Sequence, residues 1–272
     1  MKEASHIHLE RHGTGEPLLL IHGTGGSGFH WQPVLELLSG HRELLVVDLP
    51  GHGRSDPPPH GVEHTPIGYA RVLADTLDGL GLETAHACGN SVGGWTALEL
   101  AKLGRTRSVV AIAPAGMWAK HDPWRCTFQL ASQYRMGRLL APLMRRAMQH
   151  ERLRGVLMHG TIDHGREVSP DAAIRIADDY AATPTFPQHL RATRRARFRD
   201  GRGIRVPVTV AWGDKERLIP AKARLRDELP SQTRFVVLEG CGHLAMWDAP
   251  ELVARIILEG TPSVEMAQPV AN

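Results

Sequence analysis

A serine in a glycine-flanked turn is the residue of this chain best suited to act as a nucleophile. Ser91 is the centre of a G-x-S-x-G motif at 89–93, which follows a short apolar strand predicted over 85–88 and precedes a helix predicted over 95–103. A sharp turn of this kind, a nucleophile elbow, lifts the serine hydroxyl above the edge of a sheet. Its backbone is strained, and side chains two residues before and after the serine would collide, so glycine is needed at both positions. The spacing therefore predicts that Ser91 is a covalent nucleophile.

A glycine-rich loop follows the apolar run at 17–21, which is predicted as a strand buried on both faces. Residues 22–28 of this loop read His-Gly-Thr-Gly-Gly-Ser-Gly. A backbone that turns its N–H groups toward a reacting carbonyl needs this absence of side chains, which suits one half of an oxyanion hole. The alternative is a phosphate-binding loop. It is disfavoured because the lysine of G-x-x-x-x-G-K-[ST] is missing and G-x-G-x-x-G is not matched.

Two further groups of polar residues are interpreted as structural. Asp48 and His52 lie in the loop at the end of a strand predicted over 42–49, where we expect them to fix a tight turn. His6 and His8 would share one strand face, but no carboxylate or cysteine is grouped with them. We therefore predict no metal site.

The elements that position these motifs alternate between strand and helix. This alternation predicts an α/β fold with a mainly parallel sheet covered on both faces. The predicted strands span 7–10, 17–21, 42–49, 85–88, 108–113, 206–212 and 234–238, and the predicted helices of this part span 31–38, 67–80 and 95–103, with one more between the last two strands.

Between about 117 and 200 the pattern changes, and this part of the sequence predicts helices without convincing strands. The predicted helices include 139–148 and 172–182. We predict an inserted helical cap at 117–200, a core formed by 1–116 and 201–260, and a flexible tail at 261–272. The cap carries 15 Lys and Arg against 8 Asp and Glu, whereas the rest of the chain carries 17 against 21. We interpret this excess as solvated helix faces, and the alternative is attraction of acidic substrates or of a membrane surface.

Five motifs in register make the chain resemble the α/β-hydrolase superfamily. The resemblance covers nearly all of the chain outside the cap and the tail after Gly260. It implies the α/β-hydrolase fold, in which a mainly parallel central sheet has helices on both faces and an inserted helical cap. The N-terminal strand pair typical of the family is cut here to about one strand. The motifs are 22–25, 48–55, the serine turn at 89–93, 212–220, and Gly242-His243 leading to Asp248-Ala249-Pro250-Glu251.

The resemblance also implies a catalytic set in the chain order serine, acid, histidine. Ser91 would attack a substrate carbonyl, and His243 would take and return its proton. The backbone N–H groups of Thr24 and Val92 would hold the oxyanion. The resemblance implies no metal and no cofactor.

The acid departs from the family pattern. It usually sits three residues after the glycine of a W-G-x-x-D loop, which here is Glu216 and not an aspartate. Asp214 lies close enough to compete, but it directly follows a predicted strand, where we expect it to fix the loop. We therefore predict that Glu216 is the acid, with Asp214 as the alternative.

The implied activity is hydrolysis of carboxylic esters of small to medium apolar acyl substrates through an acyl-enzyme. A serine at 91 argues against the dehalogenase and epoxide hydrolase branches, which resemble this chain but place Asp there. Met, Trp and Phe side chains of the cap could supply an apolar cleft. The residues predicted to line the substrate pocket are Gly25, Trp118, Leu218 and Leu244.

Three alternatives to an esterase stay open. One is a carbon–carbon bond hydrolase of meta-cleavage products, which 89–91 and 241–247 partly resemble, although the oxyanion loop lacks Gly-Pro-Gly and Leu244 replaces the Trp expected after His243. An acyltransferase or perhydrolase could use the same triad. A ligand receptor on this fold is the non-enzyme alternative, which the intact Ser, acid and His set disfavours.

Composition limits the partners. With 272 residues, 42% of them hydrophobic, the chain can bury one large core, and a net charge of +3 does not indicate a nucleic-acid partner. The N-terminus has no apolar segment of the signal-peptide kind, and no run of 18 apolar residues occurs. The oligomeric state stays open. Three unclustered cysteines, Cys88, Cys126 and Cys241, argue against a disulfide framework or a zinc site. We expect a cytoplasmic protein with a small-molecule substrate and no stable membrane insertion.

Overall fold

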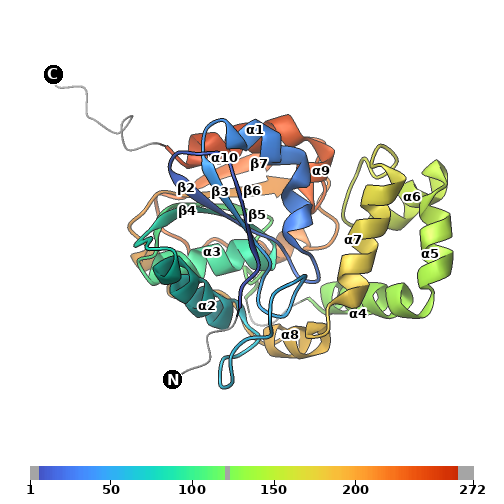
Figure 1. Cartoon of the computed structure of the whole chain (residues 1–272), viewed down its shortest axis with the longest axis horizontal. Helices are drawn as coiled ribbons and strands as arrows, with labels where there is room; N and C mark the ends of the chain where they lie inside the picture. The colour runs from blue at the N-terminus through green and yellow to red at the C-terminus, as the bar shows by residue number, and fades with distance from the viewer. Residues whose placement is uncertain (1–5, 120–122, 263–272) are drawn as a thin grey trace.

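The computed structural model describes residues 6–119 and 123–262. Its centre is a seven-stranded sheet of order β1-β3-β2-β4-β5-β6-β7 (Figure 1). β1 pairs antiparallel with β3, and the other neighbouring pairs are parallel. The predicted mainly parallel α/β sheet is therefore confirmed. The strands are β1 (Leu9–His12), β2 (Pro17–Ile21), β3 (Glu43–Val47), β4 (Ala85–Asn90), β5 (Thr106–Ile112), β6 (Val208–Gly213) and β7 (Arg234–Leu238).

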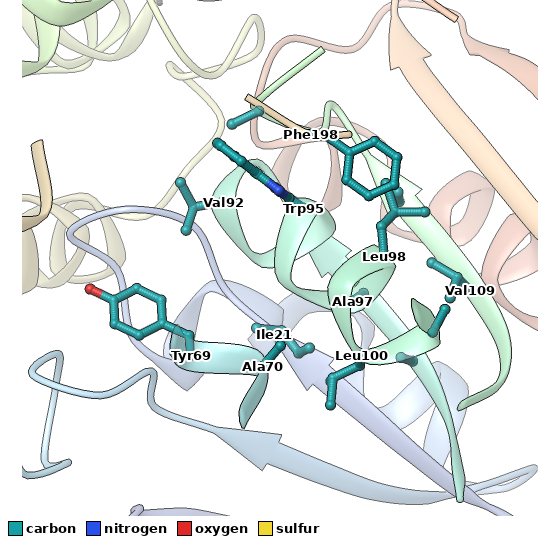
Figure 2. Close-up of a cluster of buried hydrophobic side chains, with 14 of the residues drawn as sticks. Ile21, Tyr69, Ala70, Val92, Trp95, Ala97, Leu98, Leu100, Val109 and Phe198 are labelled. Carbon is teal, nitrogen blue, oxygen red and sulfur yellow. The ribbon is translucent and has the colours of Figure 1, made fainter. Parts of the chain in front are cut away.

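Strand β2 shows why both faces of the sheet are covered. All five of its residues are buried, and alternate residues join different hydrophobic clusters. Leu19 and Ile21 pack in one cluster with side chains of α2 (Pro66–Gly79) and α3 (Val92–Lys102), part of which Figure 2 shows. Leu18 and Leu20 pack in the other cluster. This cluster includes side chains of α1 (Leu35–Ser39), of the short α9 (Ala245–Asp248) and of α10 (Pro250–Gly260), together with side chains of the cap.

The predicted helical cap is present between β5 and β6. Figure 1 shows α4 to α7 standing to one side of the sheet, with α8 next to α4. Within the cap, α4 packs along α7, and α5 packs against both α6 and α7. The cap helices are α4 (Trp124–Leu139), α5 (Ala141–Met148), α6 (Glu151–Met158), α7 (Pro170–Ala182) and α8 (Phe186–Thr193), followed by the 3-10 turn η2 (Gly201–Gly203). None of the helices in the described ranges is long and apolar enough to cross a membrane.

The α-helix predicted over 31–38 is mostly wrong. The first part of the segment belongs to a 3-10 helix, η1 (Gly28–Val34), and only its last part belongs to an α-helix, the five-residue α1. Pro33 lies inside η1 and has no N–H for an α-helical bond. The hydroxyl of Ser27 accepts the N–H of Phe29 and so fixes where the 3-10 segment begins.

The helix predicted between the last two strands is also wrong. Only one 3-10 turn forms there, η3 (Ala221–Ala223). The N–H of Leu225 donates to the carbonyl of Met117, at the start of the cap, whereas the bonds within the segment are of the turn type, such as that from the N–H of Ala223 to the carbonyl of Pro220. At the end of the chain, Thr261 is buried and its carbonyl accepts a hydrogen bond from the Arg42 guanidinium. The remainder of the predicted tail, 263–272, lies outside the described residues.

Candidate active site

Ser91 occupies the sharp turn between β4 and α3. Its φ of 57° is in the left-handed region, which residues other than glycine rarely adopt. β4 and α3 approach so closely that a Cβ on Gly89 would lie 2.2 Å from the carbonyl carbon of Gly93. A Cβ on Gly93 would lie 2.1 Å from the oxygen of Ile21, at the end of β2. The predicted crossing of strand and helix thus explains Gly89, whereas the neighbouring strand β2 explains Gly93. The N–H of Ser91 donates to the carbonyl of Ile112 on β5, which ties the strained turn to the sheet.

Glu216 and His243 form a buried pair. Glu216 lies in the loop after β6 and His243 in the loop after β7, and Nδ1 of His243 donates to Oε2 of Glu216 over 2.6 Å. The other oxygen, Oε1, accepts the N–H groups of Leu218 at 2.7 Å and Ile219 at 3.0 Å. Burial alone would raise the pKa of Glu216, but the charge and hydrogen bond of His243 and these two N–H groups hold that pKa below its ordinary value. The carboxylate therefore fixes the proton of the ring on Nδ1 and leaves Nε2 free to accept one.

Asp214 is differently placed. Its side chain is 35% exposed and pairs with Nζ of Lys215 at 3.1 Å. That neighbour lowers the pKa of Asp214. The structure thus brings Glu216, and not Asp214, to His243.

Two backbone N–H groups are available beside Ser91. Val92 is the first residue of α3, where helical N–H groups lack internal partners and the helix dipole is positive. Within the described part of the chain, neither the N–H of Val92 nor that of Thr24 has an acceptor. Both residues line the cavity that Ser91 and His243 also line. Free N–H groups on two residues that line the same cavity as Ser91 are what an oxyanion hole needs.

The cavity has a volume of about 330 Å³ and extends from Ser91 into the cap. Its wall in the cap is mostly apolar, with residues from all five cap helices, among them Leu130, Met136, Met144, Met148, Val156, Leu157, Met158, Ile176 and Leu190. Among its described lining residues there is no Asp, Glu, Lys or Arg. His30 also lines it, and burial lowers the pKa of His30 to about 4, so this ring is neutral.

Three of the four predicted pocket residues line this cavity: Trp118, Leu218 and Leu244. Gly25 does not line it. A Cβ at Gly25 would meet the Tyr180 ring of α7 at 2.3 Å, so the cap covers this glycine directly.

The glycine-rich loop at 22–28 is hydrogen-bonded to the cap, which no local sequence signal indicates. The hydroxyl of Ser27 donates to Asp179 of α7 at 2.5 Å, and Oγ1 of Thr24 lies 3.1 Å from Nε2 of His189 on α8. Nδ1 of His189 lies 3.1 Å from the carbonyl of His64, which can only accept. Burial lowers the pKa of His189 to about 3, so the ring is neutral, Nδ1 donates and Nε2 accepts from Thr24.

The loop before His243 has its own support in Asp248. The two carboxylate oxygens of Asp248 accept the N–H groups of Gly242 and of His164, a cap residue, each at 2.7 Å. Asp48 acts in the same way at the other loop, accepting from the N–H groups of Gly28 and Arg54. The expected structural role of Asp48 is thus borne out.

This fold and this serine, histidine and carboxylate arrangement define an α/β-hydrolase. The model of the alpha/beta hydrolase family matches residues 18–256, and the chain belongs to that family. It is 36% identical over 214 residues to "Epoxide hydrolase EphH" of Mycobacterium tuberculosis. The aligned residues cover 71% of this chain and 97% of that protein. It is 26% identical over 275 residues to "2-hydroxy-6-oxo-6-phenylhexa-2,4-dienoate hydrolase" of Comamonas testosteroni, covering 93% of this chain and 90% of that one.

The solved structure of carboxylesterase CesB from Bacillus subtilis is similar with a TM-score of 0.73. At 21% identity, over 96% of this chain and 89% of that one, the similarity shows the fold alone. The chain is thus an enzyme of the α/β-hydrolase family whose named relatives act on different bonds.

Proposed function

We propose that this protein is a serine hydrolase that cleaves carboxylic esters of small to medium apolar acyl groups through an acyl-enzyme. The observation that carries the proposal is a single cavity that contains Ser91 on its strained turn, the His243 ring oriented by Glu216, and two free N–H groups. A cavity of about 330 Å³ is at the small end of ligand pockets.

The cycle follows from this arrangement. Oγ of Ser91 attacks the ester carbonyl while Nε2 of His243 takes its proton, and the N–H groups of Thr24 and Val92 bind the oxyanion. Collapse of the tetrahedral intermediate returns that proton to the leaving alcohol and leaves the acyl group on Ser91. Water then repeats the sequence and releases the acid. Glu216 stabilises the imidazolium at both tetrahedral stages.

The cavity wall favours an ester over a meta-cleavage product. Such a product carries a carboxylate, which is costly to bury unless a cation pairs with it. No Lys or Arg is among the described residues that line the cavity. An uncharged ester needs no such partner.

Chemistry also favours an ester over an epoxide, despite the epoxide hydrolase among the relatives. A carboxylate that opens an epoxide forms an ester, which water can hydrolyse, whereas a serine forms an ether that this cycle cannot cleave. Opening also needs a proton donor for the epoxide oxygen. Among the described residues that line the cavity, the tyrosine is Tyr180. Its hydroxyl already donates to the carbonyl of Leu130, so its proton is not directed to a bound epoxide.

The test is a direct comparison of substrates with purified protein. We expect p-nitrophenyl butyrate to be hydrolysed with a higher kcat/KM than a 2-hydroxy-6-oxo-dienoate, and styrene oxide to give no sustained turnover. A kcat/KM for the dienoate about a hundredfold above that for the ester would overturn the proposal. Sustained diol formation from styrene oxide would do the same.

A further inference from the structure

A second concave surface, separate from the catalytic cavity, lies where α4 meets the core. We call it the α4 groove. It lies on the side of the molecule where Figure 1 shows α4 and α8 next to each other. Its main walls are Trp124, Arg125 and Phe128 of α4, Arg194 and Arg195 after α8, and Lys222 of η3.

The α4 groove is positively charged. Five cations line it, and none of its described lining residues is Asp or Glu. The fifth, Arg217, forms an ion pair with Asp163 at 2.6 Å. The four cations named above have no carboxylate partner within the described residues. An adjoining groove between α4 and α8 adds Arg135 and Arg191, which also have none there.

The α4 groove is apolar as well as positive. Trp124 is 74% exposed and Phe128 is 67% exposed, whereas large aromatic residues of a folded protein are mostly buried. Residues 124, 128, 131 and 135 follow helical spacing, so Trp124, Phe128, Ala131 and Arg135 share one stripe of α4. Exposed aromatic rings beside Arg and Lys are the composition of segments that lie at a membrane interface.

The α4 groove shares two wall residues with the catalytic cavity. Trp118 and Leu218 line both. A bilayer surface against the α4 groove would therefore lie beside the wall of the cavity that contains Ser91.

We propose that the α4 groove docks the protein on a bilayer that contains anionic lipids. A second copy of the chain fits this surface less well, because a two-fold contact would bring the same unpaired cations face to face. The bound state needs no spanning helix, only insertion of Trp124 and Phe128 into the headgroup region while the surrounding arginines contact lipid phosphates.

The test is cosedimentation of the full chain with vesicles of phosphatidylcholine alone and of phosphatidylcholine with phosphatidylglycerol in a ratio of about 2:1. We expect strong binding only to the second, weakening as salt is raised. Changing Arg191, Arg194 and Arg195 together to Gln should weaken the partition coefficient about a hundredfold, since each cation near an anionic surface is worth about a fivefold change. Changing Trp124 and Phe128 to Ala should weaken it by about tenfold or more.

Matched changes on the core serve as controls. Arg71→Gln, Arg255→Gln and Val237→Ala alter exposed side chains far along the chain from α4, and we expect unchanged binding. Hydrolysis of p-nitrophenyl butyrate in buffer should be unchanged in the α4 groove variants, which shows that they fold, because none of these side chains lines the catalytic cavity. Equal binding to both kinds of vesicle, or binding unaffected by the α4 groove changes, would overturn the proposal.

Sedimentation equilibrium without lipid tests the other occupant. A dimer that the Trp124 and Phe128 changes convert to a monomer would assign the surface to self-association and overturn the proposal. Because vesicle binding is measured without turnover, a protein that binds but does not hydrolyse the butyrate would contradict the proposed function alone.

Discussion

Changing Glu216 to Gln should remove most of the activity while leaving the fold and KM nearly unchanged. Oε1 of Glu216 accepts two backbone N–H groups, so the amide oxygen of Gln must take that position and its NH₂ must face Nδ1 of His243. Nδ1 then has to accept, which moves the ring proton to Nε2, where it blocks transfer from Ser91. The lost charge adds to this. A pair of opposite charges about 4 Å apart at an effective dielectric constant of about 20 is worth about 4 kcal/mol, or about 10³ in kcat.

The assay is steady-state hydrolysis of p-nitrophenyl butyrate, with Asp214→Asn as the matched control. Asp214 is partly exposed and pairs with Lys215, so its change should alter kcat by no more than about threefold. A Glu216→Gln protein within about fivefold of the unchanged enzyme, together with loss of activity in Asp214→Asn, would refute this account of the acid.

Three further predictions follow from the same contacts. Ser91→Ala and His243→Ala should each lower kcat by about 10⁴–10⁶, and the double variant should be no worse, since the two act as one unit; a further loss of several powers of ten would contradict this. His189→Phe keeps a ring stacked on Tyr69 but removes the acceptor of the Thr24 hydroxyl, together with the Nδ1 contacts to the carbonyl of His64 and the hydroxyl of Tyr69. It should lower kcat about 10- to 100-fold at similar KM, and an unchanged kcat would show that this anchor does not support the loop at 22–28. Burial lowers the pKa of His52 from 6.5 to about 4 and that of His189 from 6.5 to about 3. As the pH falls, these two histidines are therefore protonated in the unfolded chain before they are protonated in the folded protein. The free energy of unfolding, measured in urea, should therefore drop by about 3 to 5 kcal/mol per histidine between about pH 6.5 and 3, and a His52→Gln variant should show a smaller drop.

The elements with local signals were predictable. Continuous apolar runs identify the central strands because a parallel sheet is buried on both faces, and β2 is buried at every position. The glycines around Ser91 identify the turn because only glycine fits that close crossing. The resemblance to the α/β-hydrolase superfamily favoured Glu216 over Asp214, because Glu216 stands where the family places its acid, and Glu216 lies 2.6 Å from His243.

The parts that were missed depend on contacts between distant segments. In place of the helix expected after residue 220, one 3-10 turn forms. The N–H of Leu225 then donates a hydrogen bond to the start of the cap, about a hundred residues earlier in the chain. The bonds from Thr24 to His189 and from Ser27 to Asp179 join residues more than 150 positions apart. Such pairs carry no periodicity or motif, so only the folded structure reveals that the cap is hydrogen-bonded to the loop at 22–28.

The central claim is that Ser91 is a nucleophile activated for acyl transfer. Its most direct test is the intact mass of the protein after treatment with a fluorophosphonate, followed by peptide mapping. We predict a single adduct on Ser91, formed in the unchanged protein and absent in Ser91→Ala, with strongly slowed labelling in His243→Ala. No adduct on the folded protein, or an adduct on a different serine, would contradict the account.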